Sequence, residues 1–537
     1  MPSNLWRCRV LLIVSAVLIS SVSAQRKVSA THGNVEEITA AQLKAYLSFI
    51  ASDELEGRDT PSRGLNTAAQ FLATQLMRWG VAPAGENGGY FQTIELSHVT
   101  IDPRLTTAEL NGKRWQYGED FLAKEIAAKV SAPLVYVGQC WTIKADSIFA
   151  DESLEVRGQI MITHAGFPSG FRFGRAEWES PSGYAKRRGA LGIIYIPTFQ
   201  TLTNWPKTRQ NAVEVGEIFV DKFEEAEGAA VPNLTASTQM LTEIFRGEGE
   251  NAQTVFKRGL TGEKGKAFAL EANKRMSFVA GVRAKPEFTK NVIGVLEGSD
   301  SKLKKEYVAL GAHYDHVGVG RAVAGDSIYN GADDDGSGTA AVLAMAEAFA
   351  NGPRSKRSIL FVWHTGEEQG LWGSKYFTRY PTVPLQQIIA QLNMDMIGRG
   401  KESGDTNSAN AELSGANEVY VIGAKMMSTQ LGELSERVNK NFLNLAFNYR
   451  YDDPHDPNQF FYRSDHFHYA RKGIPIIFYF DGIHENYHKP SDSVDKIDFA
   501  KLEKVTRTIF ATAWELANLP NRPAIDKQLP AELMTAH

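Results

Sequence analysis

The spacing of hydrophobic residues changes twice along the chain and divides it into three parts. In the first part, residues 38–96, Ala40–Ser52 is amphipathic and Leu65–Trp79 has apolar residues at close to helical spacing, whereas Phe91–Leu96 alternates as a strand does. This pattern predicts helices followed by a strand. Because these helices lack a core of their own, we expect them to pack on a later part of the chain.

The second part, from about residue 125 to 275, consists of short β-branched runs separated by Gly and Pro. These runs are Ala132–Val137, Gln159–Thr163 and Ala190–Pro197. No cluster of acids and histidines with metal-ligand spacing occurs in this stretch of sequence. We therefore predict an inserted, mainly β module that serves packing or gating and carries no chemistry of its own.

From Asn291 onward, apolar runs of strand length alternate with helical patterns, which predicts an α/β domain with a mostly parallel sheet. The residues from 400 to 460 are rich in Asn, Gly, Asp and Tyr and predict an excursion with one helix near Gly423–Asn439. The predicted strands are Asn291–Leu296, Tyr307–Gly311, Ile359–Trp363, Gln391–Met394 and Ile474–Phe480, and the predicted helices are Ser337–Ala350 and Ala500–Leu516.

Residues 1–24 have the pattern of a secretory signal peptide. Arg7 and Arg9 precede the apolar stretch Val10–Leu18, and small residues then lead to Ala24. The apolar stretch is shorter than the roughly 20 residues that span a bilayer. We expect cleavage after about Ala24, which makes the mature chain secreted or periplasmic and leaves no transmembrane segment.

Composition narrows the class of protein. A chain of 537 residues is too long for a single core, and its 43% hydrophobic and 22% charged content is that of a globular protein. The net charge is −4 and no basic run stands out, so we expect no nucleic-acid partner. Two cysteines, Cys8 and Cys140, cannot form a disulfide framework. The oligomeric state stays open.

Acids and histidines gather in five short segments of the third part. Most of these segments directly follow an apolar run, and strand ends in an α/β sheet share a crevice. The segments are Gly311–His316 with His313 and Asp315, Asn330–Gly338 with Asp333, Asp334 and Asp335, His364–Gly370 with Glu367 and Glu368, Asn393–Gly398 with Asp395, and Tyr487–Asp492 with His488.

These residue types indicate a metal centre. Three consecutive carboxylates, Asp333 to Asp335, repel one another near a folded core unless a cation balances them. Glu367 and Glu368 are adjacent and point in different directions, so that one can bind metal while the other acts as a general base. Two imidazoles and three carboxylates suit two sites that share one bridging carboxylate. Such nitrogen and oxygen donors favour zinc, with cobalt or manganese as alternatives.

The chain resembles the di-zinc aminopeptidases related to bacterial leucyl aminopeptidase and to the transferrin-receptor-like peptidases. The resemblance also includes Leu55–Arg58, Ser464–His466 and Gly189–Gly192, the last of which is similar to a protease-associated domain. It implies the zinc exopeptidase fold, a mixed, mostly parallel sheet sandwiched by helices, with two zinc ions per chain and peptide substrates. The metal and base residues that carry the resemblance are His313, Asp334, Glu367, Glu368, Asp395 and His488.

The resemblance assigns the metal ligands by position. Asp334 would bridge the two ions. His313 and Asp395 would complete one site, and Glu368 and His488 the other. The Asp334–Asp335 peptide bond would be cis.

Three further residues receive catalytic roles from the resemblance. Glu367 would be the general base that takes a proton from the attacking water and delivers it to the leaving amine. Asp315 would orient His313, and Tyr487 would donate its phenol to the tetrahedral oxyanion. The other histidines of these segments, His316 and His364, are expected to support or pack, as the family gives them no metal.

Domain boundaries follow from the same reading. We expect a signal peptide at 1–24, the N-terminal part of the peptidase domain at 25–124 and a protease-associated domain inserted at 125–275. The catalytic zinc peptidase domain then covers 276–520, and 521–537 is a C-terminal tail. Asp465 and His466 are candidates for shaping the site, and Cys140 is interpreted as a buried apolar residue.

Alternatives to an aminopeptidase remain at this point. A carboxypeptidase of the glutamate-carboxypeptidase type would need arginines that grip a C-terminal carboxylate, and Arg399, Arg450 and Arg463 lie near the motifs. A single-zinc glutaminyl cyclase shares the fold but does not need the run of three acids. A receptor-like protein without activity would have lost ligands, whereas this chain keeps Glu367.

Overall fold

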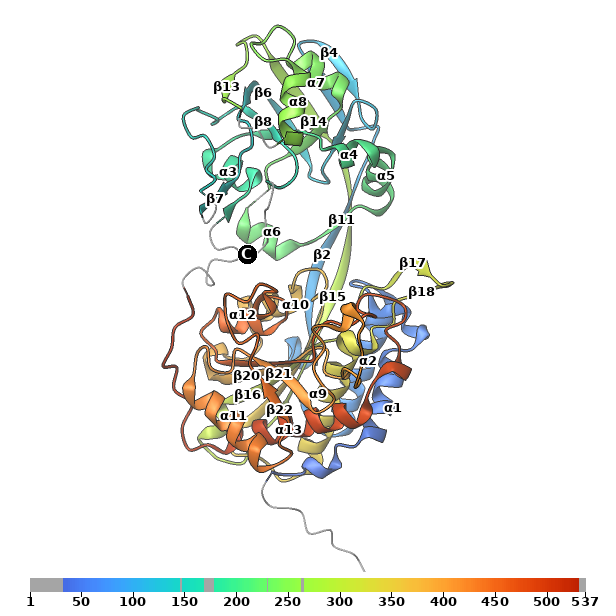
Figure 1. Ribbon diagram of the computed structural model, residues 1–537, viewed down its shortest axis with the longest axis vertical. Helices are drawn as coiled ribbons and strands as arrows, with labels where there is room; N and C mark the ends of the chain where they lie inside the picture. The colour runs from blue at the N-terminus through green and yellow to red at the C-terminus, as the bar shows by residue number, and fades with distance from the viewer. Residues whose placement is uncertain (1–31, 145–146, 169–177, 229, 262–264, 531–537) are drawn as a thin grey trace, which may run out of the picture.

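Two large β-sheets, one in each of two units, organise the chain in the computed structural model (Figure 1). The structure describes residues 32–144, 147–168, 178–228, 230–261 and 265–530. The predicted signal peptide and the last residues of the predicted tail lie outside this range. Within it, no helix is both long and apolar enough to cross a membrane.

The larger sheet has ten strands in the order β11–β2–β15–β19–β16–β20–β23–β21–β22, with β1 paired to β15. The strands are β1 Ala82–Pro83, β2 Phe91–Ile101, β11 Glu217–Val220, β15 Val282–Leu296, β16 Tyr307–His313, β19 Ser358–His364, β20 Ile388–Met394, β21 Glu418–Ile422, β22 Ala446–Asn448 and β23 Ile476–Phe480.

The central strands β19, β16, β20 and β23 run parallel to one another, and antiparallel pairs flank them at both sides. Every residue of β19, β20 and β23 is buried, because helices cover both faces. This is why these strands appear in the sequence as continuous apolar runs. The predicted mixed, mostly parallel sheet between helices is confirmed, with the parallel strands at its centre.

One face of this sheet shares a large apolar core with five helices, and the other face packs against two shorter ones. The first group is α1 Ala40–Ile50, α2 Arg63–Arg78, α9 Gly338–Asn351, α11 Thr429–Asn441 and α13 Phe499–Asn518, and the second is α10 Trp372–Arg379 and α12 His466–Ala470. The N-terminal helices α1 and α2 contribute Leu43, Leu47 and Leu72 to the larger core, as predicted from their lack of a core of their own.

The second sheet has nine strands in the order β4–β3–β14–β6–β8–β10–β12–β5, with β13 paired to β6. Its strands are β3 Thr107–Leu110, β4 Lys113–Gln116, β5 Phe121–Ala123, β6 Ala128–Tyr136, β8 Ile160–His164, β10 Gly192–Ile196, β12 Asn233–Ala236, β13 Phe268–Ala269 and β14 Arg275–Ala280. Short helices accompany it: α3 Pro181–Arg188, α4 Phe199–Thr203, α5 Trp205–Gln210, α6 Asp221–Glu227, α7 Thr238–Ile244 and α8 Ala252–Thr261.

The second unit is larger than the predicted insertion at 125–275. Strands β3, β4 and β5 lie before residue 125 and still belong to the second sheet. These strands are three or four residues long, so their hydrophobic pattern is too short to be assigned from sequence. The second sheet therefore begins at Thr107.

A two-stranded ribbon of β2 and β15 connects the two units (Figure 1). It pairs Phe91 with Val292 at the end within the large sheet and Ile101 with Val282 at the other end. The chain leaves the larger unit along β2 and returns along β15, so the second unit is an insertion. Strand β11 of that insertion extends the large sheet by pairing with β2.

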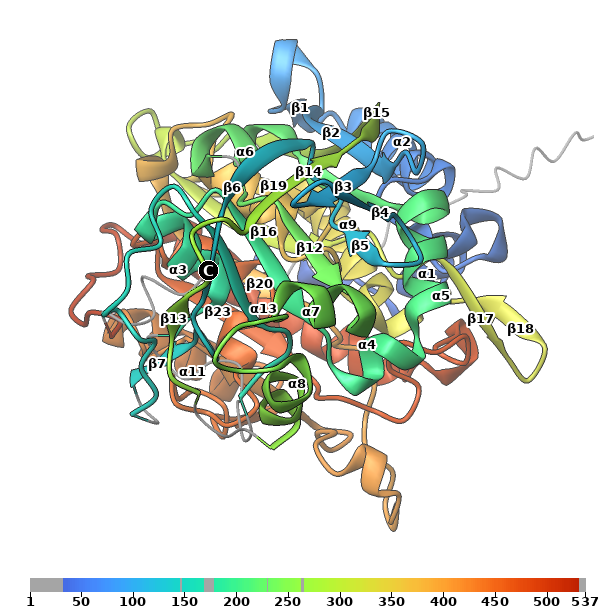
Figure 2. The same cartoon turned by 90° about the horizontal axis from the view of Figure 1, so that it is seen from above.

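Two small two-stranded sheets are also present among the described residues. β7 Thr142–Ile143 pairs with β9 Trp178–Glu179 in the second unit. β17 Val319–Val323 pairs with β18 Asp326–Ile328 and projects from the body of the molecule in both views (Figures 1 and 2).

Candidate metal centre

The chemically active residues of the five sequence segments meet at one edge of the large sheet. His313 is the last residue of β16, and Asp395 directly follows β20. Glu367 and Glu368 come soon after the end of β19, and His488 lies in the loop after β23. Since the four strands are parallel, their carboxyl ends share this edge, as the sequence pattern predicted.

Asp334 lies at the centre of the cluster and faces both histidines. Its Oδ1 is 3.3 Å from Nε2 of His313, and its Oδ2 is 3.1 Å from Nε2 of His488. The carboxylate is 3% exposed. The structure thus places Asp334 where one carboxylate can contact two cations at once.

The neighbours of Asp334 are engaged elsewhere, which explains why the second of the three acids is the central one. Asp333 accepts a hydrogen bond from the N–H of Gly398 at 2.7 Å, and its other oxygen lies 3.2 Å from His484 Nε2. Asp335 accepts from the N–H groups of His313 and Met396. Both acids therefore fasten backbone segments to one another.

Asp492 and the backbone hold the loop of three acids in place. The Asp492 carboxylate accepts hydrogen bonds from the N–H groups of Asp333 and Asp334, at 3.0 to 3.2 Å. Asp335 also accepts from Gly338 N, at the start of α9. The Asp334–Asp335 peptide bond is cis.

Two groups of possible donor atoms surround Asp334, and within each group the atoms lie within 4.8 Å of one another. The first consists of His313, Asp334 and Asp395, with 3.6 Å between His313 Nε2 and Asp395 Oδ1. The second contains Asp334, Glu368 and His488, with 3.1 Å between His488 Nε2 and Glu368 Oε2, and it also includes His316. All five residues predicted as ligands therefore come together.

The separations between donor atoms fit bound zinc. Zinc bonds of 2.0–2.2 Å in a tetrahedron put neighbouring donor atoms about 3.3 Å apart. The distances around Asp334 are 3.1 to 3.6 Å. His313 Nε2 and His488 Nε2 have no hydrogen-bond partner among the described residues, so a cation would use nitrogens that nothing else satisfies.

The local charges also favour a cation. Burial opposes a proton on His313, but the carboxylates of Asp395 and Glu367 raise its pKa well above the usual range. Burial likewise opposes protonation of His488, yet Asp334 and Glu368 raise its pKa to about 10. The carboxylates thus attract positive charge into the cluster, and a divalent cation supplies that charge with better geometry than a proton.

Glu367 belongs to neither donor group and lies beside the first. Its Oε2 is 4.0 Å from His313 Nε2. Burial raises the pKa of Glu367 well above its usual range, and the charges of Asp395 and Glu368 add to this. A buried carboxyl group with a raised pKa is suited to take up and return a proton.

Asp315 lies next to the His313 ring and makes further contacts that were not predicted. Its backbone carbonyl accepts from His313 Nδ1 at 3.2 Å, while its carboxylate is 3.7 Å from that nitrogen. The carboxylate instead accepts from the N–H groups of Glu367 and Glu368, at 3.2 and 3.4 Å. Asp315 therefore positions both glutamates in addition to standing next to His313.

Arg58 is buried beneath this site, 0% exposed, and donates only to backbone carbonyls. Its guanidinium donates to the carbonyls of Ile50, Tyr314, Asn330 and Gly331 at 2.6 to 3.0 Å. Burial lowers its pKa to about 10, and nearby carboxylates including Asp315 oppose that change. Arg58 therefore joins the N-terminal helices to two loops that carry metal donors.

A small cavity of about 30 Å³ lies over the cluster. Asp334, Glu367 and Asp395 contribute its acidic side, and Arg463 lies at its wall. Its remaining lining is apolar or aromatic: Met396, Phe460, Phe478, Phe480, Ile483 and Tyr487. The ring of Tyr487 stacks on His488 at 3.9 Å, and burial raises the pKa of its phenol.

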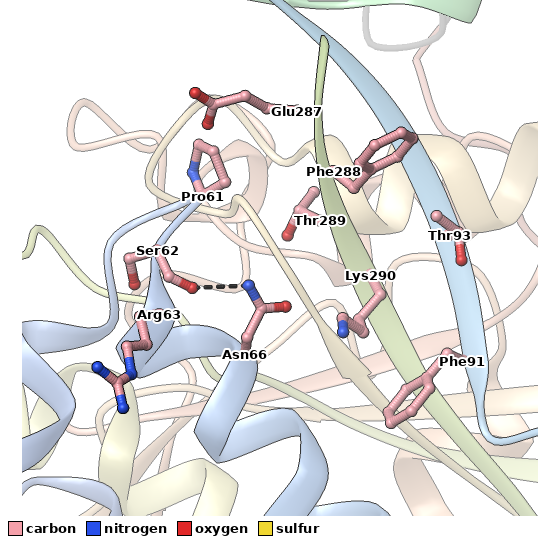
Figure 3. Close-up of a pocket in the computed structure, with 10 residues that line it drawn as sticks. All are labelled: Pro61, Ser62, Arg63, Asn66, Phe91, Thr93, Glu287, Phe288, Thr289 and Lys290. Carbon is pink, nitrogen blue, oxygen red and sulfur yellow. Dashed lines mark hydrogen bonds between the residues drawn. The ribbon is translucent and has the colours of Figure 1, made fainter.

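A larger cavity of about 440 Å³ lies elsewhere, between the start of α2 and the β2–β15 ribbon (Figure 3). Pro61 and Phe288 line it together with Arg63 and Lys290. Its lining has no histidine and one acid, Glu287, which pairs with His98 and Lys285. This cavity therefore lacks the donors for metal chemistry, and size alone does not locate the site.

Two residues proposed to shape the site are buried close to it. His466 hydrogen-bonds to the Phe461 carbonyl at 2.8 Å and stacks on Phe478. Asp465 is 0% exposed, and burial raises its pKa to about 7. Cys140 is a buried free thiol, as expected.

Sequence reasoning missed the part that His316 and Arg58 play. His316 was expected only to support or pack, but the structure places it in the second donor group. Its place beside Asp315 in the same segment was the available signal. Arg58 belongs to the segment Leu55–Arg58 that carries part of the family resemblance, but nothing in the sequence shows that its partners are four backbone carbonyls.

Comparisons with known proteins find one family model and several relatives. Residues 291–513 match the model of peptidase family M28. The chain is 28% identical over 301 residues to leucine aminopeptidase 2 of Arthroderma otae, which covers 50% of this chain and 54% of that protein. It is 26% identical over 362 residues to a probable leucine aminopeptidase 2 of Arthroderma benhamiae, covering 61% of this chain and 67% of that one.

Among solved structures, an aminopeptidase from Aneurinibacillus sp. strain AM-1 aligns with a TM-score of 0.49 and 18% identity, over 92% of this chain and 97% of that chain. A zinc aminopeptidase from Bacillus subtilis aligns with a TM-score of 0.47 and 16% identity, over 92% and 99%. The chain spans about half the length of the first curated relatives it matches.

Arg58→Lys tests whether the buried guanidinium holds the site together. Lysine keeps the charge but cannot reach four carbonyls in different directions, so buried acceptors lose their donors. We expect a loss of about 3–5 kcal/mol in the free energy of unfolding, the range for breaking a buried charged contact. Urea unfolding measures it, with Arg63→Lys on the exposed start of α2 as the control. Equal unfolding midpoints for the two variants would contradict this role.

Proposed function

We propose that this chain is a metal-dependent aminopeptidase that releases N-terminal residues from peptides, and the match of residues 291–513 to the model of peptidase family M28 supports this proposal. The observation that carries the proposal is the arrangement at the sheet edge. Two donor groups share Asp334, and Glu367 lies beside them without belonging to either. That is the arrangement which hydrolysis with two metals and one general base requires.

Each residue has a defined part in this proposal. His313, Asp334 and Asp395 would hold one zinc ion, and Asp334, Glu368 and His488 the other. When bound, the two ions supply a Lewis acid for the substrate carbonyl and lower the pKa of the attacking water.

The side chains around the ions would move protons and orient the peptide. Glu367 accepts a proton from the attacking water and returns it to the leaving amine. Tyr487, at the cavity wall, donates its phenol to the oxyanion, and the raised pKa of that phenol keeps it protonated. Asp315 fixes Glu367 through its backbone N–H.

The cavity supports an exopeptidase that accepts an apolar terminal side chain. Phe460, Phe478 and Ile483 line it next to the acids. An apolar side chain gains free energy by leaving water for such a lining. The acids at its floor attract a free ammonium group.

A second candidate is a carboxypeptidase, and one observation favours it. Arg463 lines the cavity, where a guanidinium could bind a C-terminal carboxylate. The other two arginines considered are engaged away from it, Arg399 with Asn486 and Arg450 with Glu412. Substrates with free and blocked ends separate the two activities.

We also propose that the protein is exported. Support comes from the sequence of residues 1–24, which has the charged, apolar and small-residue regions of a signal peptide. Sequencing the N-terminus of the protein recovered outside the cytoplasm tests this, and an uncleaved N-terminus contradicts it.

Activity on peptides with free and blocked termini tests whether the enzyme needs a free N-terminal amine and bound metal. Purified protein supplied with zinc should hydrolyse a short peptide with a free amine and lose activity to a strong chelator, because the two donor groups are proposed to hold the zinc that hydrolysis requires. An N-acetylated copy of the same peptide serves as the matched control. Equal cleavage of both peptides, or activity that survives chelation, contradicts an aminopeptidase. Loss of cleavage only on C-terminal amidation indicates the carboxypeptidase.

Glu367→Gln tests the general base. The amide has nearly the same volume and cannot accept the proton, so we expect kcat to fall by about 10²–10⁴-fold. Metal content should stay at the wild-type value, because Glu367 lies outside both donor groups. Glu368→Gln is the matched comparison and should lose metal. If Glu367→Gln loses metal instead, the two glutamates have exchanged roles.

Removing the second unit tests whether it takes part in chemistry. Ile101 and Val282 are paired at the end of the ribbon, so a short Gly-Ser turn can replace residues 102–281. We expect hydrolysis of an amino-acid anilide to be largely retained and the rate on longer peptides to change, because all proposed ligands lie in the larger unit. A folded deletion that no longer binds metal would contradict this division of labour.

A further inference from the structure

His316 occupies a position for which a supporting role gives no account. It is fully buried, and its Nδ1 lies 2.8 Å from Glu368 Oε1 and 3.8 Å from Asp334 Oδ2. Its ring meets that of His488 edge-on, with 5.5 Å between the ring centres. His316 thus faces the same two carboxylates as His488, from another side.

The short contact with Glu368 is not a hydrogen bond in geometry. Neither ring nitrogen of His316 has a hydrogen-bond partner among the described residues, and Glu368 Oε1 has none either. A buried polar atom without a partner costs about 1–3 kcal/mol. Two such atoms that face each other, an imidazole nitrogen and a carboxylate oxygen, are donors of the kind that bind zinc.

The backbone holds the ring of His316 in this orientation. The N–H of His316 donates to the carbonyl of Arg58 at 3.2 Å. Gly331, with a φ of +56°, lies next to the ring, and a Cβ there would come within 2.5 Å of His316 Cδ2. Glycine therefore provides the space that the ring fills, and the donor atom is fixed before any cation binds.

We propose that His316 is a fourth protein ligand of the second cation position, so that this position holds metal more tightly than the first. The proposal rests on the proposed function, since it concerns the same centre. The second position then has the donors His316, Asp334, Glu368 and His488, and the first has His313, Asp334 and Asp395.

The difference in donor number gives the two cation positions different roles. Four protein donors complete the tetrahedron of a closed zinc site, whereas three leave a coordination place for water or substrate. Glu367, 4.0 Å from His313 Nε2, lies beside the three-donor position. The four-donor position is therefore the one that anchors, and the three-donor position is the exchangeable one.

Metal retention in the full-length protein tests this assignment. Wild-type protein loaded with zinc and dialysed against a weak chelator should keep one equivalent by elemental analysis. His316→Ala should keep none under the same conditions. In competition titrations, the affinity of the tighter equivalent should fall by more than the 10–100-fold that loss of an outer-shell partner costs.

Cobalt provides a readout that packing does not affect. The visible absorption of Co²⁺ reports the number and kind of its ligands, so the first equivalent bound to His316→Ala should give a different spectrum from wild type. His364→Ala is the matched control, since His364 is equally buried and its strand position pairs with that of His313. It should keep both the retained zinc and the spectrum.

A second variant and the metal content of the wild type distinguish a folding defect, a failure of this inference and a failure of the proposed function. If His316→Ala fails to fold, His316→Asn is used, which fills part of the space and cannot reach the cation. A folded His316 variant that retains its zinc equivalent and its cobalt spectrum overturns the inference. If wild-type protein still binds two metals and hydrolyses the free-amine peptide, the proposed function stands without it. A wild type that binds no metal overturns both.

Discussion

The structure depends on how a folded protein keeps many carboxylates buried in one place. Asp333, Asp334 and Asp335 are consecutive, and Asp315, Asp395 and Asp492 are buried with them. Charges removed from water require hydrogen bonds or counter-charges of comparable strength. Backbone N–H groups supply them for Asp333, Asp335 and Asp492. For Asp334 the facing groups are imidazoles, so that among the three consecutive acids it is the one available to metal.

The large sheet and Arg58 bring the groups that stabilise these buried carboxylates to one place. Parallel strands β16, β19, β20 and β23 end at one edge, and each delivers one segment of the cluster. Arg58 also joins these loops, through a planar group with donors in several directions. Because its acceptors are carbonyls, the guanidinium stabilises loop positions while its charge balances the acids above it.

Much of this could be predicted from sequence because the signals were local. The strands were long apolar runs with both faces covered, and the donors directly followed them. Once these strands are placed side by side and parallel in one sheet, the cluster at the sheet edge follows. Features that depend on three-dimensional contacts were missed. His316 lies in the same segment as His313, but only the structure shows that its Nδ1 faces Glu368.

Other misses have different physical causes. The start of the second unit was predicted too late, at residue 125. The cause is that strands β3, β4 and β5, which lie before that residue, are too short to show a clear hydrophobic period. The carboxylate of Asp315 lies 3.7 Å from His313 Nδ1, but its hydrogen bonds from the N–H groups of Glu367 and Glu368 were not predicted. Backbone donors have no sequence signature, so such contacts cannot be deduced from residue types.

The two oxygens of Asp334 belong to two donor groups that differ in composition. Oδ1 faces His313 and Oδ2 faces His488, so each oxygen belongs to a different donor group. Asp315 places Glu367 and Glu368 through adjacent N–H groups, and adjacent side chains diverge. Glu368 is thereby directed to His488, and Glu367 to the His313 side. Asp315 thus positions both glutamates, and in the proposed mechanism it separates the metal ligand Glu368 from the base Glu367, which lies beside the position with fewer protein donors.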